Sequence, residues 1–213
     1  MRKSGFLVLL MFVLFGCGTA AGQTAIADKL KAAGEETRQT LEALDAAITK
    51  AQGALQQLKE MDPEAREAAL DESFQSFRQQ IVVVLERVDD NGEFMDAMAA
   101  AEVQTRRLKA WFERQPADYP RRDETIARLD KALQRFVTLK DEIRGERDTA
   151  LGLLADIGTR HAQAVQLAKA DLVDQALDTV QDVVDSIKGL NGKLRTVVDQ
   201  AIGVVPDAAV PVQ

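Results

Sequence analysis

The residue types that most often carry chemistry in proteins are scarce in this chain of 213 residues, which has one Cys and one His. Di-iron bundles need two Glu-x-x-His pairs and HExxH zinc sites need two histidines, so His161 completes neither. Since His161 falls on a helical seam, we expect it to be a packed or hydrogen-bonded core histidine. The segment DDNG at 89–92 does not fit an EF-hand loop, because that alignment places Arg87 at position one and Met98 at position twelve. The sequence thus predicts no catalytic residue, no metal site, no cofactor and no enzymatic activity.

One segment does combine side chains that are suited to binding. Residues 105–122 contain six basic and two acidic residues, and therefore carry a charge of +4, whereas the whole chain carries −7. The same segment holds the only Trp and the only Tyr. Such a combination suits lipid headgroups, an acidic envelope polymer or a protein partner. Alternatively, the aromatic rings seal the end of a helical hairpin and the arginines keep it solvated. The candidate contact residues are Arg106, Arg107, Lys109, Trp111, Phe112, Tyr119, Arg121 and Arg122.

The overall charge of the chain also limits the classes of partner that it can bind. An excess of seven acidic residues disfavours generic binding to nucleic acid or to an anionic membrane surface. Nucleic acid is therefore not an expected partner, and any basic binding surface must be local.

The N-terminus has the pattern of a bacterial export signal. A basic start, Met1-Arg2-Lys3, precedes an unbroken apolar run at 6–15, which is about half the length of a spanning helix. The run ends in Leu14-Phe15-Gly16-Cys17, which resembles the lipobox, where the cysteine is lipidated through its thiol and becomes the first mature residue. We therefore predict a lipoprotein signal peptide at 1–16 and lipid attachment at Cys17.

The residue after the cysteine bears on the destination. Gly18, rather than Asp, is what Gram-negative lipoproteins sent to the outer membrane commonly show. We expect an exported, lipid-anchored protein that faces the periplasm, in the outer membrane of a Gram-negative bacterium. The alternative is ordinary signal-peptidase cleavage near the small residues at 20–22 or 25–27, which would release a soluble protein.

Apolar residues recur in steps of three and four along the mature chain, which predicts an all-α fold. The first stripe begins at Leu30 and stops at Met61, where Asp62 is a good N-cap and Pro63 suits the first helical position. The stripe of the second helix consists of Leu70, Phe74, Phe77, Ile81, Val84 and Val88. Its phase changes at Asn91-Gly92, which indicates a kinked or interrupted helix there rather than a full turn.

Two more helices follow the loop at 115–120. The third carries apolar residues from Ile126 onward, with Lys140 and Arg147 interrupting its seam, and Asp171 is the predicted N-cap of the fourth. The outer two helices have about 33 residues and the inner two about 48. We predict an elongated antiparallel four-helix coiled-coil bundle in which helices two and three form a longer, projecting hairpin. A uniform bundle of broken helices is the alternative.

The predicted organisation comprises a tether at 17–27, the bundle at 28–203 and an extended tail at 204–213. Because the tether is short and the second helix is longer than the first, the basic and aromatic hairpin end is expected on the membrane-proximal side of the bundle.

The lipobox-like start, the charged heptad helices and the block Trp111-x-Glu113, Tyr119 and Arg122-Asp123 resemble one group of bacterial lipoproteins. These are described as domain of unknown function 2959 and are predicted coiled-coil envelope proteins. The resemblance covers most of the mature chain and implies no activity, catalytic residue or cofactor.

These observations favour a non-enzymatic cell-envelope lipoprotein that acts as a scaffold or adaptor through coiled-coil surfaces. Its expected partners are the membrane, through the lipid anchor, and an envelope protein, and a homo-oligomer is a further option. The alternative is a periplasmic helical-bundle ligand sensor or chaperone. That function would need a pocket between helices, beside small seam residues such as Gly34, Ala51 and Gly152.

Overall fold

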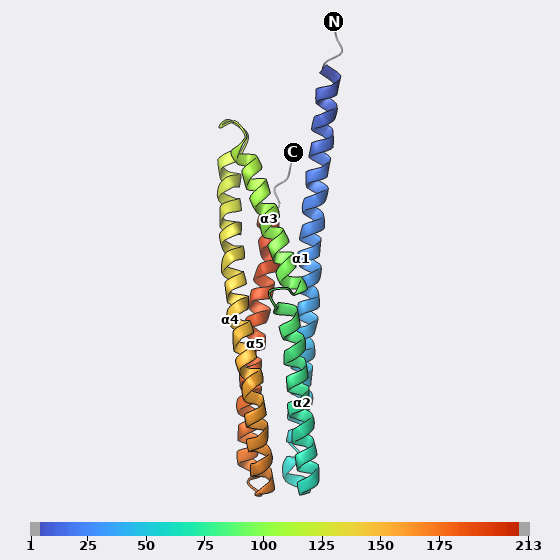
Figure 1. Cartoon of the computed structure of the whole chain (residues 1–213), viewed down its shortest axis with the longest axis vertical. Coiled ribbons are helices and arrows are strands. Elements are labelled where there is room, and N and C mark those ends of the chain that lie inside the picture. The colour runs from blue at the N-terminus through green and yellow to red at the C-terminus, as the bar shows by residue number, and fades with distance from the viewer. Residues whose placement is uncertain (1–4, 209–213) are drawn as a thin grey trace.

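The computed structural model describes the backbone of residues 5–208 and the side chains of residues 25–204 (Figure 1). The predicted start at residues 1–4, the end of the predicted tail at 209–213 and the side chain of Cys17 lie outside the described residues. The elements are α1 (Gly5–Leu55), the 3₁₀ turn η1 (Leu58–Glu60), α2 (Pro63–Val88), α3 (Glu93–Glu113), α4 (Arg122–Lys169) and α5 (Val173–Ala208). The described residues contain no strand, which confirms the all-α prediction.

The helices form an elongated antiparallel bundle. The arm made by α2 and α3 packs beside α1 and α4, and α5 lies between α1 and α4 (Figure 1). Since α3 continues in the direction of α2, the two helices together with α4 form a hairpin whose end projects beyond α5 (Figure 1). The prediction of a bundle with a longer projecting hairpin is confirmed.

Local capping begins the arm at the predicted place. The Asp62 carboxylate accepts a hydrogen bond of 2.8 Å from the backbone N–H of Ala65, and Pro63 occupies the first helical position. Leu58 of η1 is fully buried, so the turn that links α1 and α2 is packed against the core. This is the N-terminal capping that an Asp-Pro pair favours.

The phase change at 89–92 interrupts the arm without reversing it (Figure 1). α2 ends at Val88, and the backbone of Gly92 is extended and caps α3. A Cβ atom at Gly92 would lie 2.6 Å from the carbonyl oxygen of Arg87, so only glycine fits this close approach. Val88 and Phe94, on either side of the break, are both fully buried. The break thus shifts the phase of the apolar stripe, so that the residues on both sides of it stay buried while the arm continues along the core.

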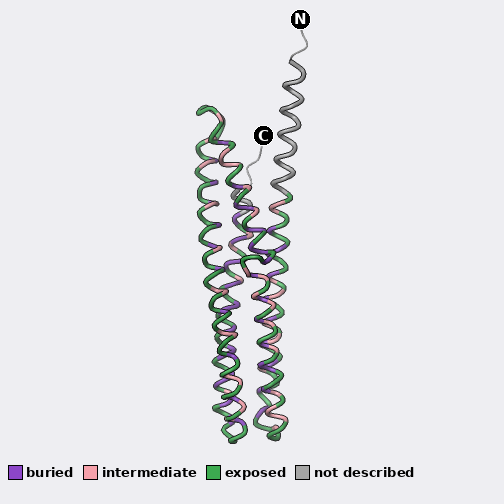
Figure 2. The backbone as a smooth tube through the Cα atoms, viewed as in Figure 1, coloured by how far each residue is buried: buried purple, intermediate pink, exposed green. Residues whose placement is uncertain are grey.

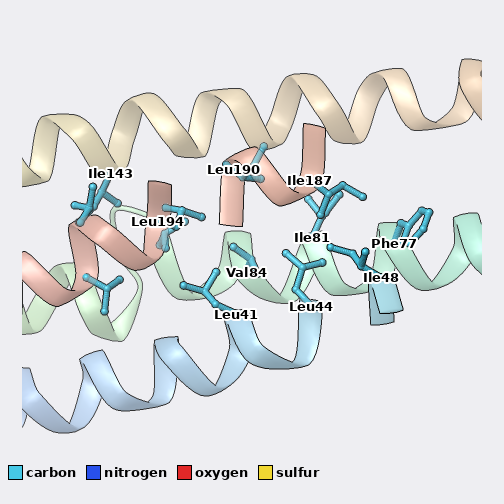
Figure 3. Close-up of a cluster of buried hydrophobic side chains, with 14 of the residues drawn as sticks. Leu41, Leu44, Ile48, Phe77, Ile81, Val84, Ile143, Ile187, Leu190 and Leu194 are labelled. Carbon is cyan, nitrogen blue, oxygen red and sulfur yellow. The ribbon is translucent and has the colours of Figure 1, made fainter. Parts of the chain in front are cut away.

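Buried positions recur along the length of the bundle (Figure 2), and those of α1, α2 and α5 belong to one hydrophobic cluster. The predicted stripe of the second helix is buried throughout. A central part of the core is shown in Figure 3, with labelled buried side chains Leu41, Leu44, Ile48, Phe77, Ile81, Val84, Ile143, Ile187, Leu190 and Leu194. Each large aliphatic side chain removed from water contributes about 1.5–3 kcal/mol to folding. This continuous burial holds the long helices together.

The prediction that Asp171 is the N-cap of the last helix is wrong. Asp171 has a left-handed backbone (φ 60°) and ends α4, with its N–H donating to Ala168 O at 3.1 Å. The next N–H, of Leu172, donates to Leu167 O at 2.9 Å. These two bonds form a Schellman motif, and the left-handed conformation that it needs is incompatible with the extended backbone of an N-cap.

The last helix also continues past the predicted boundary at residue 203. α5 runs to Ala208, so the first residues of the predicted extended tail are helical. Val204 lies three residues after Ala201 on the same stripe, and both side chains are fully buried. The burial of Val204 outweighs the low helix propensity of the neighbouring Gly203. At the other end, α1 includes the backbone of the predicted tether.

Candidate functional site

The hairpin end between α3 and α4 carries a cluster of three aromatic rings. The ring of Trp111 lies edge-on to that of Phe112, with a centroid distance of 4.8 Å, and to that of Tyr119, with 5.7 Å. Phe112 and Tyr119 are 6.0 Å apart in a similar geometry. Such edge-to-face pairs are favourable beyond their buried area. Phe112 is 4% exposed and closes the hairpin, whereas Trp111 is 38% exposed and is accessible from outside.

The loop holds this cluster through short backbone hydrogen bonds. The N–H of Tyr119 donates to Pro116 O at 3.0 Å, and the N–H of Arg122 donates to Tyr119 O at 3.1 Å. Arg121, between them, has a left-handed backbone (φ 57°) and precedes the first residue of α4. The two successive turns place Tyr119 against the end of α3, where its ring meets Trp111.

Three of the six basic side chains at the hairpin end form ion pairs within the protein. Arg122 braces the loop, because it pairs with Asp123 at 2.6 Å and donates to the backbone oxygen of Glu113 at 3.2 Å. Lys109 pairs across the hairpin with Asp130 at 2.6 Å, and this hydrogen bond raises the pKa of Lys109. Arg106 pairs with the carboxylate of Glu102 one turn earlier. These residues stabilise the hairpin.

The other three basic side chains, those of Arg107, Arg114 and Arg121, have different surroundings. Arg114 donates through Nε to Ala110 O at 2.9 Å, which helps to end α3. Arg107 and Arg121 are exposed, and neither forms an ion pair with any carboxylate in the part of the chain that the structure describes. Of the eight predicted contact residues, Trp111, Arg107 and Arg121 are exposed, and Tyr119 is half-buried. Arg106 is exposed as well, but its guanidinium is paired with Glu102.

A polar cluster at the middle of the bundle explains the interruptions in the third helix. Lys140 of α4 pairs with the carboxylate of Glu102 on α3, which is 6% exposed. Arg147 pairs with Asp90, in the break between α2 and α3, at 2.7 Å. Arg144 also contacts Asp90, through Nε at 2.8 Å, and these hydrogen bonds lower the pKa of Asp90. The interruptions were visible in sequence, but their partners on α3 and at the break were not.

His161 is hydrogen-bonded as expected, but it is half-buried and does not belong to the core. Its Nε2 atom lies 2.6 Å from an oxygen of Asp71, and its ring centroid is 5.0 Å from that of Phe74. Within residues 25–204, no three His, Cys, Asp or Glu side chains are grouped so that they could hold a metal ion.

A ligand pocket beside small seam residues would need open space between helices at Gly34, Ala51 or Gly152. A Cβ atom at Gly34 would lie 2.6 Å from Cδ1 of Ile202, so that side chain fills the space. Ala51 is buried in the core, and Gly152 faces solvent. At Gly34 the small size therefore permits close packing of α1 against α5, and at Gly152 it leaves an open surface position.

An open groove lies elsewhere, beside the break between α2 and α3. It has a volume of about 390 Å³. Its lining residues are Val82, Leu85 and Glu86 of α2, Asp89, Asn91 and Gly92 of the break, and Arg147 and Leu151 of α4. Val82 and Leu151 are both exposed. The groove could hold an apolar group at the surface, and sequence periodicity contained no signal for it because its walls come from separate helices.

The hairpin end and the N-terminal part of α1 lie at the same end of the bundle (Figure 1). Among the residues that the structure describes, no helix combines the length and the apolar character that a membrane span requires. The arrangement brings residues 105–122 to the end from which α1 leaves the bundle.

Comparisons of the chain with protein-family models, with curated proteins and with solved structures give no match. The resemblance to the lipoproteins described as domain of unknown function 2959 therefore stays a prediction from the residues quoted for it.

Proposed function

We propose that this chain is a non-enzymatic lipoprotein of the bacterial cell envelope that acts as a scaffold or adaptor. The observation that carries the proposal is the shape of the bundle. α4 alone has 48 residues, which corresponds to a length of about 70 Å, and it packs along the arm of α2 and α3 on one side and α5 on the other. A rod of this kind separates its two ends and holds them in a fixed relation.

The anchor of this scaffold is the lipid predicted at Cys17. The sequence pattern that supports it is a basic start, a short apolar run and a cysteine directly after that run. In this proposal the protein is exported, faces the periplasm and is held in the outer membrane of a Gram-negative bacterium. The membrane is then one partner, reached through the acyl chains.

The sides of the rod offer surfaces for a second partner. Five large aliphatic side chains along the rod are 40–49% exposed, although most of the other Val and Leu side chains of the described residues are buried. Val82, Val103, Val137 and Leu151 lie on α2, α3 and α4, whereas Leu172 lies in the turn before α5. Exposed aliphatic side chains on long helices suit contact with another helix, from an envelope protein or from a second copy of the chain.

Two experiments test the proposal. Cells given an alkyne fatty acid should label the protein, and the label should be lost in Cys17→Ser. A photo-crosslinking residue at position 103 or 151 should capture a defined envelope protein or a second copy, whereas the same residue at the exposed polar position 78 should not. An unlabelled wild-type protein with a mature N-terminus near residue 23 or 28 would contradict the anchor.

The groove beside Val82 and Leu151 supports a second candidate, a periplasmic ligand sensor or chaperone. An apolar ligand bound there should raise the unfolding temperature of the protein, and Leu151→Lys should abolish this effect. If a panel of amphipathic metabolites and apolar peptides produces no thermal shift, the sensor function is contradicted and the scaffold function is unaffected.

A further inference from the structure

The hairpin end combines exposed aromatic and basic side chains at the end of the bundle where α1 departs. We infer that this tip, formed by Trp111, Tyr119, Arg107 and Arg121, docks on a bilayer surface that contains anionic phospholipids. The inference deepens the proposed function and rests on it, because it places the tip against the same membrane that holds the lipid at Cys17. The protein would then have two points of attachment.

The lengths of the helices bring the tip to the level of the anchor. Between Cys17 and Leu55, α1 rises about 57 Å along its axis. α2 and α3, with 26 and 21 residues, together rise about 70 Å from the turn that follows α1. The hairpin end thus reaches the level of Cys17 and extends about 10 Å beyond it. Acyl chains on Cys17 lie in the bilayer, so a tip at this level meets the headgroups.

The side chains of the tip match an interfacial environment. The indole of Trp111 is exposed while its edge-on contacts with Phe112 and Tyr119 hold it in one orientation. Pro116 and Pro120 of the same loop are also exposed. Trp and Tyr are enriched where membrane and water meet, because their rings are apolar and their N–H and O–H groups are polar. A fixed, exposed indole beside prolines therefore suits the headgroup region.

The charge of the tip is complementary to an anionic surface. Arg107 and Arg121 are not neutralised by a carboxylate of the described residues, whereas Glu113 and Asp123 are engaged by Lys109 and Arg122. Each arginine close to an anionic membrane strengthens binding about fivefold. Residues 105–122 carry +4, of which the carboxylates of Glu102, Asp123 and Asp130 neutralise three, so a net charge of +1, with Asp118 included, remains to attract the surface.

The opposite end of the rod has the reverse charge. The turn regions at 56–67 and 168–174 contain three basic and six acidic residues. An anionic membrane would repel that end and attract the hairpin end. The charge distribution therefore favours the same orientation as the position of Cys17, although the two features are independent.

Trp111 reports on the tip without ambiguity, because it is the only tryptophan of the chain. The full-length acylated protein is reconstituted into vesicles of phosphatidylcholine, with or without phosphatidylglycerol. We expect its emission to shift to shorter wavelength in the vesicles with phosphatidylglycerol, relative to detergent, and to be quenched by lipids with brominated acyl chains. The shift should be smaller with phosphatidylcholine alone.

Single charge reversals test whether vesicle binding depends on the tip or on the surface charge of the protein in general. Binding of the unacylated Cys17→Ser protein to phosphatidylglycerol vesicles, measured by flotation, should fall about fivefold or more in Arg107→Glu and in Arg121→Glu. Arg78→Glu makes the same change at an exposed position on α2 and should leave binding unchanged. Equal losses in all three variants, with circular dichroism showing intact helices, would overturn the inference.

The experiments distinguish a failure of the proposed lipid anchor from a failure of the proposed docking by the tip. Labelled protein whose Trp111 emission is the same in detergent and in both kinds of vesicle would overturn the tip inference and leave the proposed function intact. Unlabelled protein whose Trp111 still responds to phosphatidylglycerol would support the tip and overturn the anchor. An emission change produced by a purified envelope protein but not by vesicles would assign the tip to a protein partner and overturn its docking on lipid.

Discussion

Lys140 of α4 forms an ion pair with the carboxylate of Glu102 on α3, although the two residues lie 38 positions apart in the sequence. The Lys140 side chain is 18% exposed, and Glu102 is nearly buried. Glu102 also pairs with Arg106 on its own helix, so one carboxylate serves two cations. Charges in such surroundings are tolerated only while they are paired. The pair therefore couples α3 to α4.

We predict that Glu102→Ala lowers the free energy of unfolding by about 3 kcal/mol, because Lys140 then loses its partner. Arg106→Ala should lower it by only about 0.5 kcal/mol, since that arginine is largely exposed. Urea denaturation followed by circular dichroism measures both. The double substitution Glu102→Leu with Lys140→Met should restore most of the stability. A Glu102→Ala protein as stable as Arg106→Ala would contradict this account.

Asp90 is expected to make stability depend on acid. The hydrogen bonds from Arg144 and Arg147 lower its pKa below the ordinary value of 3.8. The folded-state pKa is thus lower than the unfolded one, so the stabilisation is complete above the unfolded pKa and disappears as the pH falls through the folded pKa. Asp90→Asn should therefore reduce the urea midpoint at neutral pH. In strong acid the variant and the wild type should have the same midpoint; an equal gap at both pH values would exclude this mechanism.

Two glycine substitutions should have opposite signs. Gly92→Ala places a Cβ atom against backbone oxygens of Arg87 and Glu86, and we expect a loss of about 2 kcal/mol or more. Gly145→Ala, on the open side of α4, meets no atom within 4 Å and should gain up to about 1 kcal/mol from helix propensity. Thermal unfolding of both variants tests the break. A neutral Gly92→Ala would mean that the close approach at the break is not required.

Alanine substitutions at the two adjacent aromatic residues of the hairpin end should distinguish a ring that stabilises the fold from a ring that is available for contact. Phe112→Ala removes a buried ring and should destabilise the protein by about 3 kcal/mol. Trp111→Ala removes a ring that is partly exposed, and we expect a loss of about 1 kcal/mol from its edge-on contacts. Chemical denaturation provides both values. If Trp111→Ala proves as destabilising as Phe112→Ala, then Trp111 is mainly a structural residue of the hairpin.

Much of the fold was predictable because its signals are local. The stripe from Leu70 to Val88 repeats every three or four residues, and this spacing places its members on one helical face before any partner is known. The Asp62-Pro63 pair begins α2 through a hydrogen bond to a backbone N–H three residues later. Relative helix lengths then predict the projecting hairpin. None of these features depends on residues distant in the sequence.

The corrections arise where one residue has to satisfy two helices. Asp171 resembles an N-cap of α5, but the tight turn uses it in the left-handed conformation to end α4, and its carboxylate binds Arg66 at 2.7 Å. The small size of Gly34 suggests an open space between helices, but Ile202 occupies the space beside it. The Arg66–Asp171 ion pair and the Gly34–Ile202 contact each join chain segments that are more than 100 residues apart, which local spacing does not encode.

The same division applies to the candidate site. The sequence alone determined that the chain is helical and that its aromatic and basic residues are concentrated at 105–122. Only the tertiary structure decided which of them are available. It pairs Lys109 with Asp130 and buries Phe112, whereas Trp111 and Arg107 stay exposed. The physical reason is that helical periodicity is set by neighbours along the chain, while exposure and charge pairing are set by whichever helix packs opposite.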